Sequence, residues 1–401
     1  MKDGTHIVLI GLNFSLERQE GDKNFWIELL PLLAAEIRRI TVFSLKDHPV
    51  PVEEKTIGGC RVVINYLPPR LIQIGERKKK RLIKRGDGFP AAWGVVEKFL
   101  SGKKITAELK RLAREDPYQC IHLMDNMGLT NRIIARAADT GVSVSAMAYQ
   151  GKNRLVYNNY LRLSYRHPKL TVVPYSESFA EELIRIGIPP ERIRQIRWGV
   201  AVGEGNRPPA EAGRHRSWFS IPSGKTLYLW AGYIQQIRRK EFLLAYRCAR
   251  RALEKGLDGV FFFAFKSEEM AEEFYRYHHP GRGIHIQVTT VEEFRILKRI
   301  ADVFYSPFCR EDIIIAPPLT WLEVMSLGKP VVTTAAGGAG EIIDNGKTGF
   351  IARGEDDLLA GLFKIRGRYP EMARDCRKII EDKYNIAKTA ERYLDLFRRR
   401  G

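Results

Sequence analysis

Residues 315–332 decide the fold that we expect for this chain: they read Ile-Ala-Pro-Pro-Leu-Thr-Trp-Leu-Glu-Val-Met-Ser-Leu-Gly-Lys-Pro-Val-Val. The pattern predicts a loop that enters a helix near Leu319, a helix end at Gly328 and a short apolar strand after it. The N-terminus of such a helix presents free backbone N–H groups and the positive end of the helix dipole. We therefore expect the turn formed by Pro318, Leu319 and Thr320 to suit a pyrophosphate.

Glu323 lies one turn inside this predicted helix. Its carboxylate can accept hydrogen bonds from two vicinal hydroxyls, such as those of a ribose. The same spacing also fits a buried helix that carries a capped carboxylate. Glu323 is therefore a candidate nucleotide ligand, with a purely structural role as the alternative.

Short apolar strands alternate with longer amphipathic segments from end to end, and buried parallel strands have this appearance in a sequence. The first series of predicted strands is Ile7–Leu12, Ile40–Ser44, Arg61–Tyr66, Cys120–Met124, Val142–Ala148 and Leu170–Pro174. The second series is Leu227–Ala231, Val260–Ala264, Ile284–Val288, Val303–Ser306, Pro330–Thr334 and Gly349–Ile351. Predicted helices are Phe25–Arg38, Ala91–Phe99, Asn131–Asp139, Glu177–Ile186, Glu241–Glu254 and Thr320–Leu327. This alternation predicts an α/β fold with parallel sheets, built twice.

Residues 199–222 mark the break between the two halves. Most of this stretch is rich in Gly and Pro and has no hydrophobic period, which is typical of a linker or surface loop. We therefore expect an N-terminal domain over residues 1–198 and a C-terminal domain over residues 199–384. The remaining segment, residues 385–401, contains an amphipathic helix at Ala387–Arg400 that we expect to pack back across the domains.

Three motifs follow one another in the C-terminal half: Glu323-Val324-Met325-Ser326, Gly328-Lys329-Pro330-Val331-Val332 and Gly337-Gly338-Ala339-Gly340-Glu341. In this order they resemble the donor-binding signature of retaining GT-B glycosyltransferases of the family 4 type (glycosyl transferases group 1). Further stretches that are similar to the family are residues 176–183, 192–200 and 301–307. The resemblance therefore covers most of the chain and is specific for the fold, whereas a fold by itself does not determine a reaction.

The resemblance implies a GT-B fold, with two Rossmann-like doubly wound parallel-sheet domains that face each other across a cleft. It implies that the N-terminal domain binds the acceptor and the C-terminal domain binds a nucleotide sugar. The implied reaction moves a hexose-type sugar from a nucleotide-diphosphate donor to a hydroxyl acceptor, with retention of anomeric configuration. No metal or cofactor is implied, and the chain has no Asp-x-Asp motif that would suit a metal.

The segment from Gly232 to Lys240 occupies the place of the family's phosphate-binding loop. Counting without a gap puts Arg238 where relatives have a lysine and Tyr233 where they have an arginine. Arg238 is therefore expected to grip the diphosphate bidentately, as a catalytic group that stabilises its departure. Gly232, Tyr233, Arg239 and Lys240 are the adjacent candidates for donor binding, and a solvated helix start is the alternative.

In the N-terminal half, candidate residues follow three predicted strands. The polar loop after the first strand contains Gly21, where relatives have a glycine pair. Asp125 and Asn126 come just past strand Cys120–Met124, where residues face the crevice of an open α/β sheet. Gln150 follows the next strand, at the position where many relatives have a histidine. With Arg238 and Glu323 it forms the set of candidate catalytic residues. His122 lies inside a strand and is expected to be a core residue with hydrogen-bond partners.

Three departures from the family pattern bear on activity. Ile315 replaces a glutamate that touches the donor sugar in relatives, Tyr233 replaces an arginine, and Gln150 stands at the histidine position. The loss of the glutamate can change the donor sugar or impair catalysis. A catalytically inert nucleotide-sugar-binding protein is therefore the alternative function.

The chain is strongly basic, with 66 Lys and Arg against 47 Asp and Glu and a net charge of +19. Such an excess indicates an anionic partner. Residues Arg77–Arg85 form a basic run, and relatives often meet membrane lipids through basic N-domain surfaces, so this run is a candidate for binding an anionic membrane surface. The alternative is a solvated loop. A nucleic-acid-binding protein is less consistent, because the chain has no recognised motif and no aromatic residues interleaved with the run.

The expected compartment is the cytoplasm, with peripheral association at the inner membrane face. The 5 cysteines have no paired spacing, which argues against a disulfide framework or a zinc site. The N-terminus leads directly into an apolar strand and has no cleavage pattern of a signal peptide. No apolar run is long enough to span a membrane.

Overall fold

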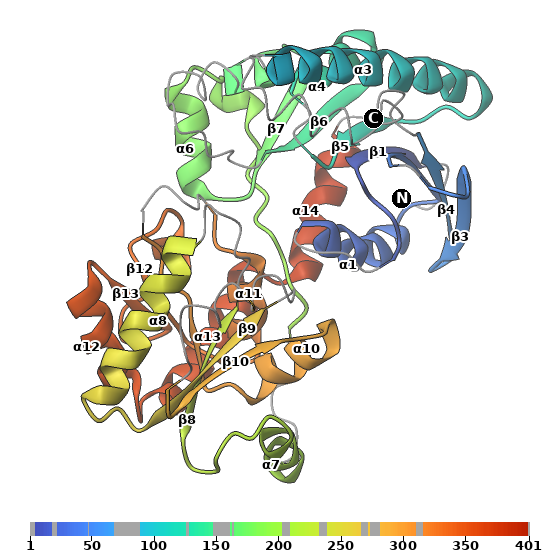
Figure 1. Cartoon of the computed structure of the whole chain (residues 1–401). Coiled ribbons are helices and arrows are strands. Elements are labelled where there is room, and N and C mark those ends of the chain that lie inside the picture. The colour runs from blue at the N-terminus through green and yellow to red at the C-terminus, as the bar shows by residue number, and fades with distance from the viewer. Residues whose placement is uncertain are drawn as a thin grey trace. The chain divides into compact units, whose positions relative to one another are not determined.

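The computed structural model describes residues 5–17, 22–46, 48–67, 89–125, 128–146, 161–162, 164–202, 209–231, 239–265, 272, 281–309 and 316–399 (Figure 1). The chain forms two compact units. Unit 1 consists of Met1–Trp198 together with Ile386–Gly401, and unit 2 consists of Gly199–Asn385. The C-terminal segment is thus part of unit 1.

Unit 1 is built on one sheet with the strand order β3-β4-β2-β1-β5-β6-β7. Its strands are β1 (His6–Leu12), β2 (Arg39–Leu45), β3 (Val52–Ile57), β4 (Cys60–Tyr66), β5 (Cys120–Leu123), β6 (Gly141–Ala146) and β7 (Leu170–Pro174). All neighbours are parallel except β3 and β4. The apolar runs that predicted six of these strands are buried on both faces, as expected for a parallel sheet covered by helices.

Strand β3 was not predicted from the sequence. It reads Val-Glu-Glu-Lys-Thr-Ile, is mostly exposed, and pairs antiparallel with β4 at the sheet edge. Its charged side chains hide it from a search for apolar runs, and charge protects an edge from further pairing. The two-residue turn Gly58-Gly59, with φ angles of 56° and 81°, is the signal that was overlooked.

The helices of unit 1 are α1 (Asp22–Ala34), α3 (Phe89–Glu115), α4 (Leu129–Ala137), α6 (Glu177–Arg185) and α14 (Ile386–Arg398). Helix α3 extends far beyond the predicted Ala91–Phe99. Helix α14 packs against α1, so that the Tyr393 ring lies 5.2 Å from the ring of Trp26. Because α14 contributes buried residues to this core, the last segment completes unit 1.

Unit 2 contains a fully parallel sheet with the order β10-β9-β8-β11-β12-β13. The strands are β8 (Thr226–Ala231), β9 (Gly259–Phe265), β10 (Ile284–Val288), β11 (Val303–Tyr305), β12 (Val331–Thr334) and β13 (Gly349–Ala352). The helices are α7 (Pro209–Trp218), α8 (Arg239–Glu254), α10 (Val291–Ile300), α11 (Leu319–Ser326), α12 (Glu355–Ile365) and α13 (Tyr369–Lys383). Helices α8 and α12 pack together on one side of the sheet, and α11 packs with α13 (Figure 1).

Helix α7 corrects the expectation that residues 199–222 form a linker without regular structure. Pro209 stands at the helix start, where its fixed φ is favourable, and Ala210 and Glu211 are good helix formers. The helix has no apolar stripe, and Trp218 is 62% exposed. A search of the sequence for amphipathic periods therefore does not find this helix.

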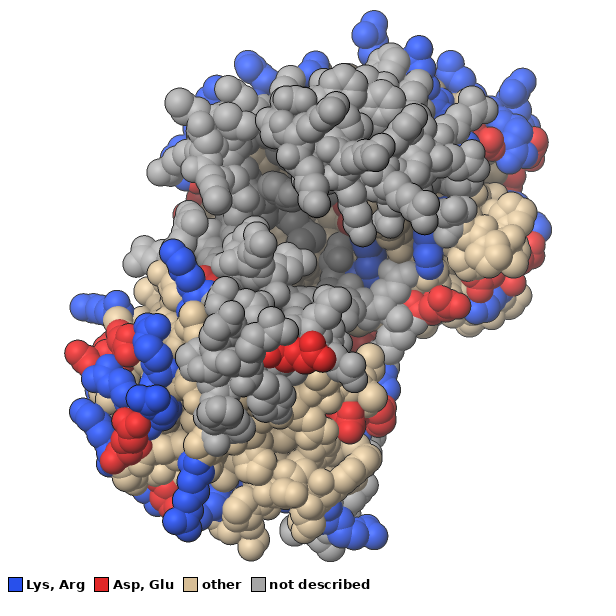
Figure 2. All heavy atoms as spheres, viewed as in Figure 1, with Lys and Arg blue, Asp and Glu red and all other residues tan. Residues whose placement is uncertain are grey.

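Charges of both signs intersperse on the part of the surface that the structure describes (Figure 2). On α8, Arg247 and Arg251 reach Glu355 of α12 at 3.2 and 3.1 Å, and Arg251 also reaches Asp356 at 3.0 Å. The net charge of +19 is therefore not gathered on α8 and α12.

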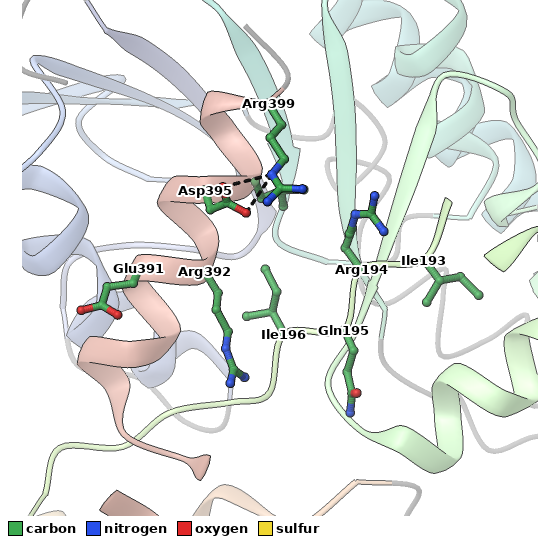
Figure 3. Close-up of a pocket in the computed structure, with 9 residues that line it drawn as sticks. Ile193, Arg194, Gln195, Ile196, Glu391, Arg392, Asp395 and Arg399 are labelled. Atoms are coloured by element: carbon green, nitrogen blue, oxygen red, sulfur yellow. Dashed lines mark hydrogen bonds and ion pairs between the residues drawn. The ribbon is translucent and has the colours of Figure 1, made fainter. Parts of the chain in front are cut away.

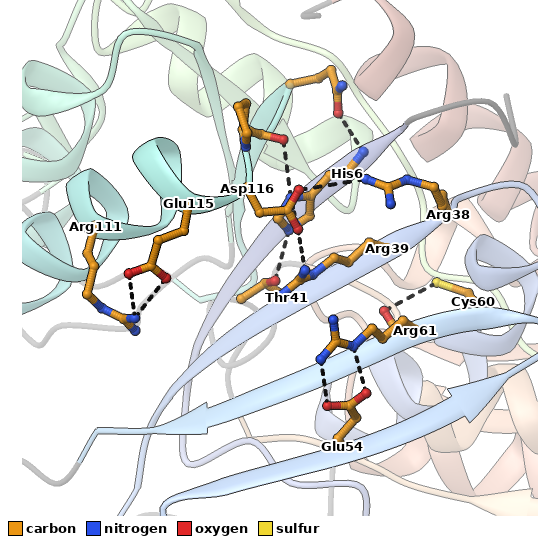
Figure 4. Close-up of polar contacts among 12 residues, drawn as sticks. His6, Arg38, Arg39, Thr41, Glu54, Cys60, Arg61, Arg111, Glu115 and Asp116 are labelled. Carbon is orange, nitrogen blue, oxygen red and sulfur yellow. Dashed lines mark hydrogen bonds and ion pairs between the residues drawn. The ribbon is translucent and has the colours of Figure 1, made fainter.

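A polar cluster joins the amino ends of β1 and β2 to the turn after α3 (Figure 4). The buried His6 places Nε2 2.8 Å from the Thr41 hydroxyl and Nδ1 3.3 Å from the Pro117 carbonyl. Asp116 pairs with Arg39 beside it. Burial lowers the pKa of His6, while the Asp116 carboxylate acts in the opposite direction. The cluster fixes the sheet edge opposite to the carboxyl ends of the strands.

His122 is confirmed as a core residue. It is fully buried, and its ring nitrogens lie 2.8 and 3.0 Å from the hydroxyls of Ser143 and Ser145. The rings of Trp26 and Tyr393 lie 5.1 and 5.2 Å from the His122 ring. The His122 side chain thus links β5 and β6 to α1 and α14.

The burial of His122 predicts a pH dependence of stability. Burial lowers its pKa to about 3, whereas the unfolded chain titrates near its ordinary value of about 6.5. The unfolded state therefore takes up an extra proton below pH ~6.5, and the free energy of unfolding should fall by roughly 1.4 kcal/mol per pH unit. Urea unfolding of the wild type and of His122→Gln between pH 7 and 4.5 measures this contribution as the difference in slope. Equal slopes would contradict it.

Candidate functional site

The sheet of unit 2 changes winding direction between its neighbours β8 and β11. From β8 the chain continues to β9 and β10 on one side, whereas β11, β12 and β13 follow on the other. Ligands of doubly wound sheets bind outside the carboxyl ends of the strands at such a switch point. The segments that leave this point are residues 232–238 after β8 and residues 306–318 after β11.

The predicted donor-binding residues lie in these two segments and at the starts of the helices that follow them. Arg239 begins α8, and the side chain of Lys240 is exposed on the first turn of that helix. Gly232, Tyr233, Arg238 and Ile315 lie outside the described residues, so their contacts stay predictions.

Helix α11 begins as the sequence predicts. Pro318 is the N-cap, and its carbonyl accepts the Trp321 amide at 2.8 Å. Within the described ranges, no side chain caps the helix and no backbone acceptor takes the amides of Leu319 or Thr320. Two backbone N–H groups are therefore available to an anion at the positive end of the helix dipole.

The other end and the inner face of α11 hold it rigidly in unit 2. Gly328, with a φ of 76°, donates its amide to Met325, and the Lys329 amide reaches Val324. This is a glycine-terminated helix end, where a left-handed residue is needed. Burial lowers the pKa of the Lys329 ammonium, which interacts with Asp302 just before β11. Lys329 therefore belongs to the amino edge of the sheet, away from the phosphate-binding end.

Glu323 is half-exposed on α11 and pairs with Lys298 of α10 through Oε2. The other oxygen, Oε1, has no partner among the described residues. The Lys298 ammonium is mostly buried and lies 5.1 Å from the centroid of the Phe294 ring, which also attracts a cation. The pair holds the carboxylate in one orientation and leaves one oxygen to accept hydrogen bonds from a ligand. Lys298 was missed because it is 25 residues away in sequence and belongs to no recognised motif.

The glycine-rich motif after β12 packs directly against the loop that enters α11. Gly338 has a φ of 79°, and a Cβ built there would lie 2.9 Å from Ala316 Cα and 3.1 Å from the Pro317 nitrogen. Only glycine fits both the left-handed conformation and this approach of two backbones. Gly338 thus positions the backbone that precedes Pro318.

The sheet of unit 1 has its own switch point, between β1 and β5. Asp125 lies there, just past β5, but its carboxylate is occupied. Oδ2 accepts the Leu12 amide at 2.6 Å, and Oδ1 accepts Lys23 of α1 at 2.7 Å. Asp125 therefore joins the end of β1 to the start of α1, which makes it a positioning group for this edge. Three predicted residues, Gly21, Asn126 and Gln150, lie outside the described residues.

The described residues contain no group of three or more His, Cys, Asp or Glu that could hold a metal ion. Within unit 2, the structure brings together the α11 N-terminus, Glu323, Lys298 and the Gly338 turn. Backbone amides there can bind an anion, and the neighbouring carboxylate can accept hydrogen bonds from hydroxyl groups.

Comparison with known proteins identifies this part of unit 2. Residues 227–364 match the family described as glycosyl transferases group 1. We call residues 227–364 the group 1 domain after this match. The match contains the switch point, α11 and the glycine-rich turn, so the candidate site lies inside the group 1 domain.

Curated relatives align with limited parts of the chain. A probable sucrose-phosphate synthase of Thermosipho melanesiensis is 32% identical over 78 residues, which are 20% of this chain and 18% of that protein. A trehalose synthase of Thermococcus litoralis is 32% identical over 117 residues, or 28% of this chain and 26% of that protein. The chain therefore matches about a quarter or less of the length of these relatives.

Solved structures resemble the chain over nearly its whole length. Sucrose-phosphate synthase from Thermosynechococcus elongatus has a TM-score of 0.71 at 16% identity and covers 98% of both chains. Anabaena HepE in complex with UDP-glucose has a TM-score of 0.67 at 13% identity, covering 97% of this chain and 98% of its own. The two Rossmann-like parallel-sheet units of this protein are those of the GT-B fold.

The packing of Gly338 in the group 1 domain predicts a position-specific loss of stability. Gly338→Ala places a Cβ against Ala316 and forces a left-handed alanine, which costs about 1–2 kcal/mol for the backbone alone. A loss of this size should lower the melting temperature of the domain by roughly 2–8 °C. Gly340→Ala is the matched control, because its Cβ would meet nothing within 4 Å. Equal melting temperatures of the two variants in differential scanning calorimetry would contradict the packing argument.

Proposed function

We propose that this protein is a nucleotide-sugar-dependent glycosyltransferase that acts on a hydroxyl acceptor with retention of configuration and without a metal. The observation that carries the proposal is the α11 N-terminus beside Glu323, at the switch point of a group 1 domain. The free amides of Leu319 and Thr320 suit a diphosphate, and Oε1 of Glu323 suits the ribose diol. Arg238, Arg239 and Lys240 complete the proposed diphosphate site.

The proposed step transfers the sugar between two oxygens. The bond from the anomeric carbon to the diphosphate breaks, and a bond from that carbon to the acceptor oxygen forms. The acceptor proton leaves with the departing diphosphate, whose developing charge is stabilised by the α11 amides and Arg238. We name no protein nucleophile. Gly21 and Asn126 are the proposed acceptor-side residues of unit 1, Gln150 is a proposed catalytic residue, and Asp125 orients that edge.

The proposed donor is a uridine diphosphate sugar. Anabaena HepE, which shares the fold, was solved with UDP-glucose. Ile315 cannot accept a hydrogen bond from a sugar hydroxyl, so the carbonyls of the Ala316-Pro317-Pro318 loop are proposed to serve instead.

A catalytically inert binding protein is the second candidate. It is motivated by the absence of the family's usual residues at Ile315, Tyr233 and Gln150. Incubation with a panel of nucleotide hexoses and deoxyhexoses, with nucleotide release and glycosylated product measured side by side, separates the two. Turnover with product supports the transferase. Tight binding without release supports the inert protein, and no nucleotide binding overturns both.

Glu323 and Lys298 predict a coupled loss of nucleotide affinity. A hydrogen bond to a charged group contributes about 1.5–3 kcal/mol, so Glu323→Gln should lower the affinity for UDP roughly 10- to 100-fold. Lys298→Met leaves the carboxylate without its orienting partner and should lower the affinity for UDP less than Glu323→Gln does. Isothermal titration of both single variants and the double variant should give non-additive losses, since the two residues act as a pair.

Glu371→Gln, on the exposed surface of α13, is the control and should bind UDP like the wild type. If Glu323→Gln also binds UDP with unchanged affinity, Glu323 does not contact the ribose. If the two losses add, Lys298 does not act through Glu323.

The basic run Arg77–Arg85 is proposed to bring the protein to an anionic membrane surface. No helix in the described part of the chain is long and apolar enough to cross a membrane. Replacing Lys78, Lys79, Lys80 and Arg81 by Gln should reduce flotation with anionic vesicles, because each contributes about 1 kcal/mol near such a surface. Added salt should reduce flotation of the wild type as well.

The control for this run replaces the exposed Lys255, Arg353, Arg374 and Lys383 by Gln, which removes the same charge elsewhere. Equal flotation of the wild type with neutral and anionic vesicles would exclude the membrane proposal. Equal losses in the two quadruple variants would assign the binding to net charge and not to the run.

A further inference from the structure

A pocket of about 600 Å³ lies in unit 1, outside the group 1 domain (Figure 3). Its walls come from two segments that are distant in sequence. One is the extended stretch Ile193–Ile196 after α6. The other runs from Glu391, in the C-terminal half of α14, to Arg399 just after that helix. The buried side chains of Ile196 and Leu396 form an apolar floor.

Three donor groups of this pocket have no partner among the described residues. Arg194 and Arg392 are exposed and their guanidinium groups make no ion pair or hydrogen bond with described residues. The Nε2 atom of Gln195 is buried and also has no hydrogen-bond partner there. Buried donors without an acceptor are costly, and native structures rarely keep them without a reason. The described side chains of the pocket therefore leave these donors without an acceptor-rich group.

The acidic side chains do not supply that group. Asp395 is paired with Arg399 at 3.0 Å, which occupies its carboxylate. Glu391 points from α14 away from the stretch Ile193–Ile196 (Figure 3). Arg399 and Arg194 approach the same opening from opposite walls, whereas Arg392 lies toward the other end. The side chains that face the pocket thus carry an excess of positive charge.

We propose that this pocket binds a small phosphate-bearing anion. Guanidinium groups match phosphate oxygens in geometry and bind them bidentately, and their hydrogen bonds to charged oxygens are the strong ones. A phosphate group has more acceptor oxygens than a carboxylate, which suits guanidinium groups on two walls of the pocket. The apolar floor accommodates a small carbon skeleton between the charged ends.

The position of the pocket gives its ligand a structural consequence. The stretch Ile193–Ile196 lies just before the chain passes from unit 1 to unit 2 at Trp198, and α14 begins just after it returns at Ile386. A ligand held by Arg194 and Arg392 bridges these two segments of unit 1. Binding should therefore stabilise the docking of α14 as well as occupy the pocket.

The test is calorimetric titration of the full chain with pyrophosphate and, separately, inorganic phosphate, at constant ionic strength and with saturating UDP. Excess UDP fills the proposed donor site, so that any binding of pyrophosphate or phosphate then measured occurs at another site. The double variant Arg194→Gln/Arg392→Gln should lose at least about tenfold in pyrophosphate affinity, because it removes two charge-assisted contacts. Arg392→Gln alone should show a smaller loss in the same direction. Pyrophosphate should raise the melting temperature of the wild type more than that of the double variant Arg194→Gln/Arg392→Gln.

The matched control is Arg114→Gln/Arg136→Gln, which removes two exposed arginines from other helices of unit 1. It should bind pyrophosphate like the wild type. No binding by the wild type at millimolar pyrophosphate or phosphate overturns the proposal, as does an equal loss in the two double variants. Failure of UDP to bind would count against the proposed function alone, because the pocket variants still report on pyrophosphate.

Discussion

The parallel pairing of β8 with β11 is the constraint on which the candidate donor site depends. Parallel neighbours require crossover connections, so the carboxyl ends of all these strands lie at one edge of the sheet. The winding reverses between β8 and β11, and ligands of doubly wound sheets bind outside the carboxyl ends of the strands at such a point. The α11 N-terminus and the start of α8 follow from that pairing. The group 1 domain therefore derives its site from sheet topology before any side chain contributes.

Side chains then refine what the backbone provides. Among the described residues no side chain caps the α11 amides, which leaves them available to an external anion. Glu323 stands one turn away, and an unrestrained carboxylate there could turn in several directions. Its pairing with Lys298 of α10 removes this freedom, and the aromatic face of Phe294 helps to hold the ammonium. Gly338 performs the corresponding task for the backbone, since any larger residue would displace the loop at Ala316.

Unit 1 is organised around the return of α14. Tyr393 and Phe397 of this helix pack near Trp26 and His122, so the end of the chain covers a core that begins with β1 and α1. The face of α14 that carries Tyr393 and Phe397 is used for this packing. Arg392 on the same helix and Arg399 just after it line the basic pocket. One helix thus provides both a structural face and a proposed binding face.

Much of the architecture could be predicted from the sequence by itself. Continuous apolar runs give strands in almost the predicted places, because a strand buried on both faces must be apolar throughout. Gly328 marked the end of α11, because a left-handed helix end favours glycine. Strand β3 and helix α7 escaped prediction because both are largely exposed and neither has an apolar pattern. Their existence depends on a sheet edge or on local helix propensity.

The arrangement of the sites was decided by tertiary structure. Sequence motifs placed Glu323 on a helix but could not reveal Lys298, because the two side chains meet only in the folded unit 2. Asp125 was located correctly past β5, yet only the fold shows that Leu12 and Lys23 occupy its carboxylate. Arg194 and Arg392 belong to no motif and are nearly 200 residues apart in the chain. They line one pocket because α14 returns to unit 1, a long-range contact whose energy comes from burying side chains that no local pattern specifies.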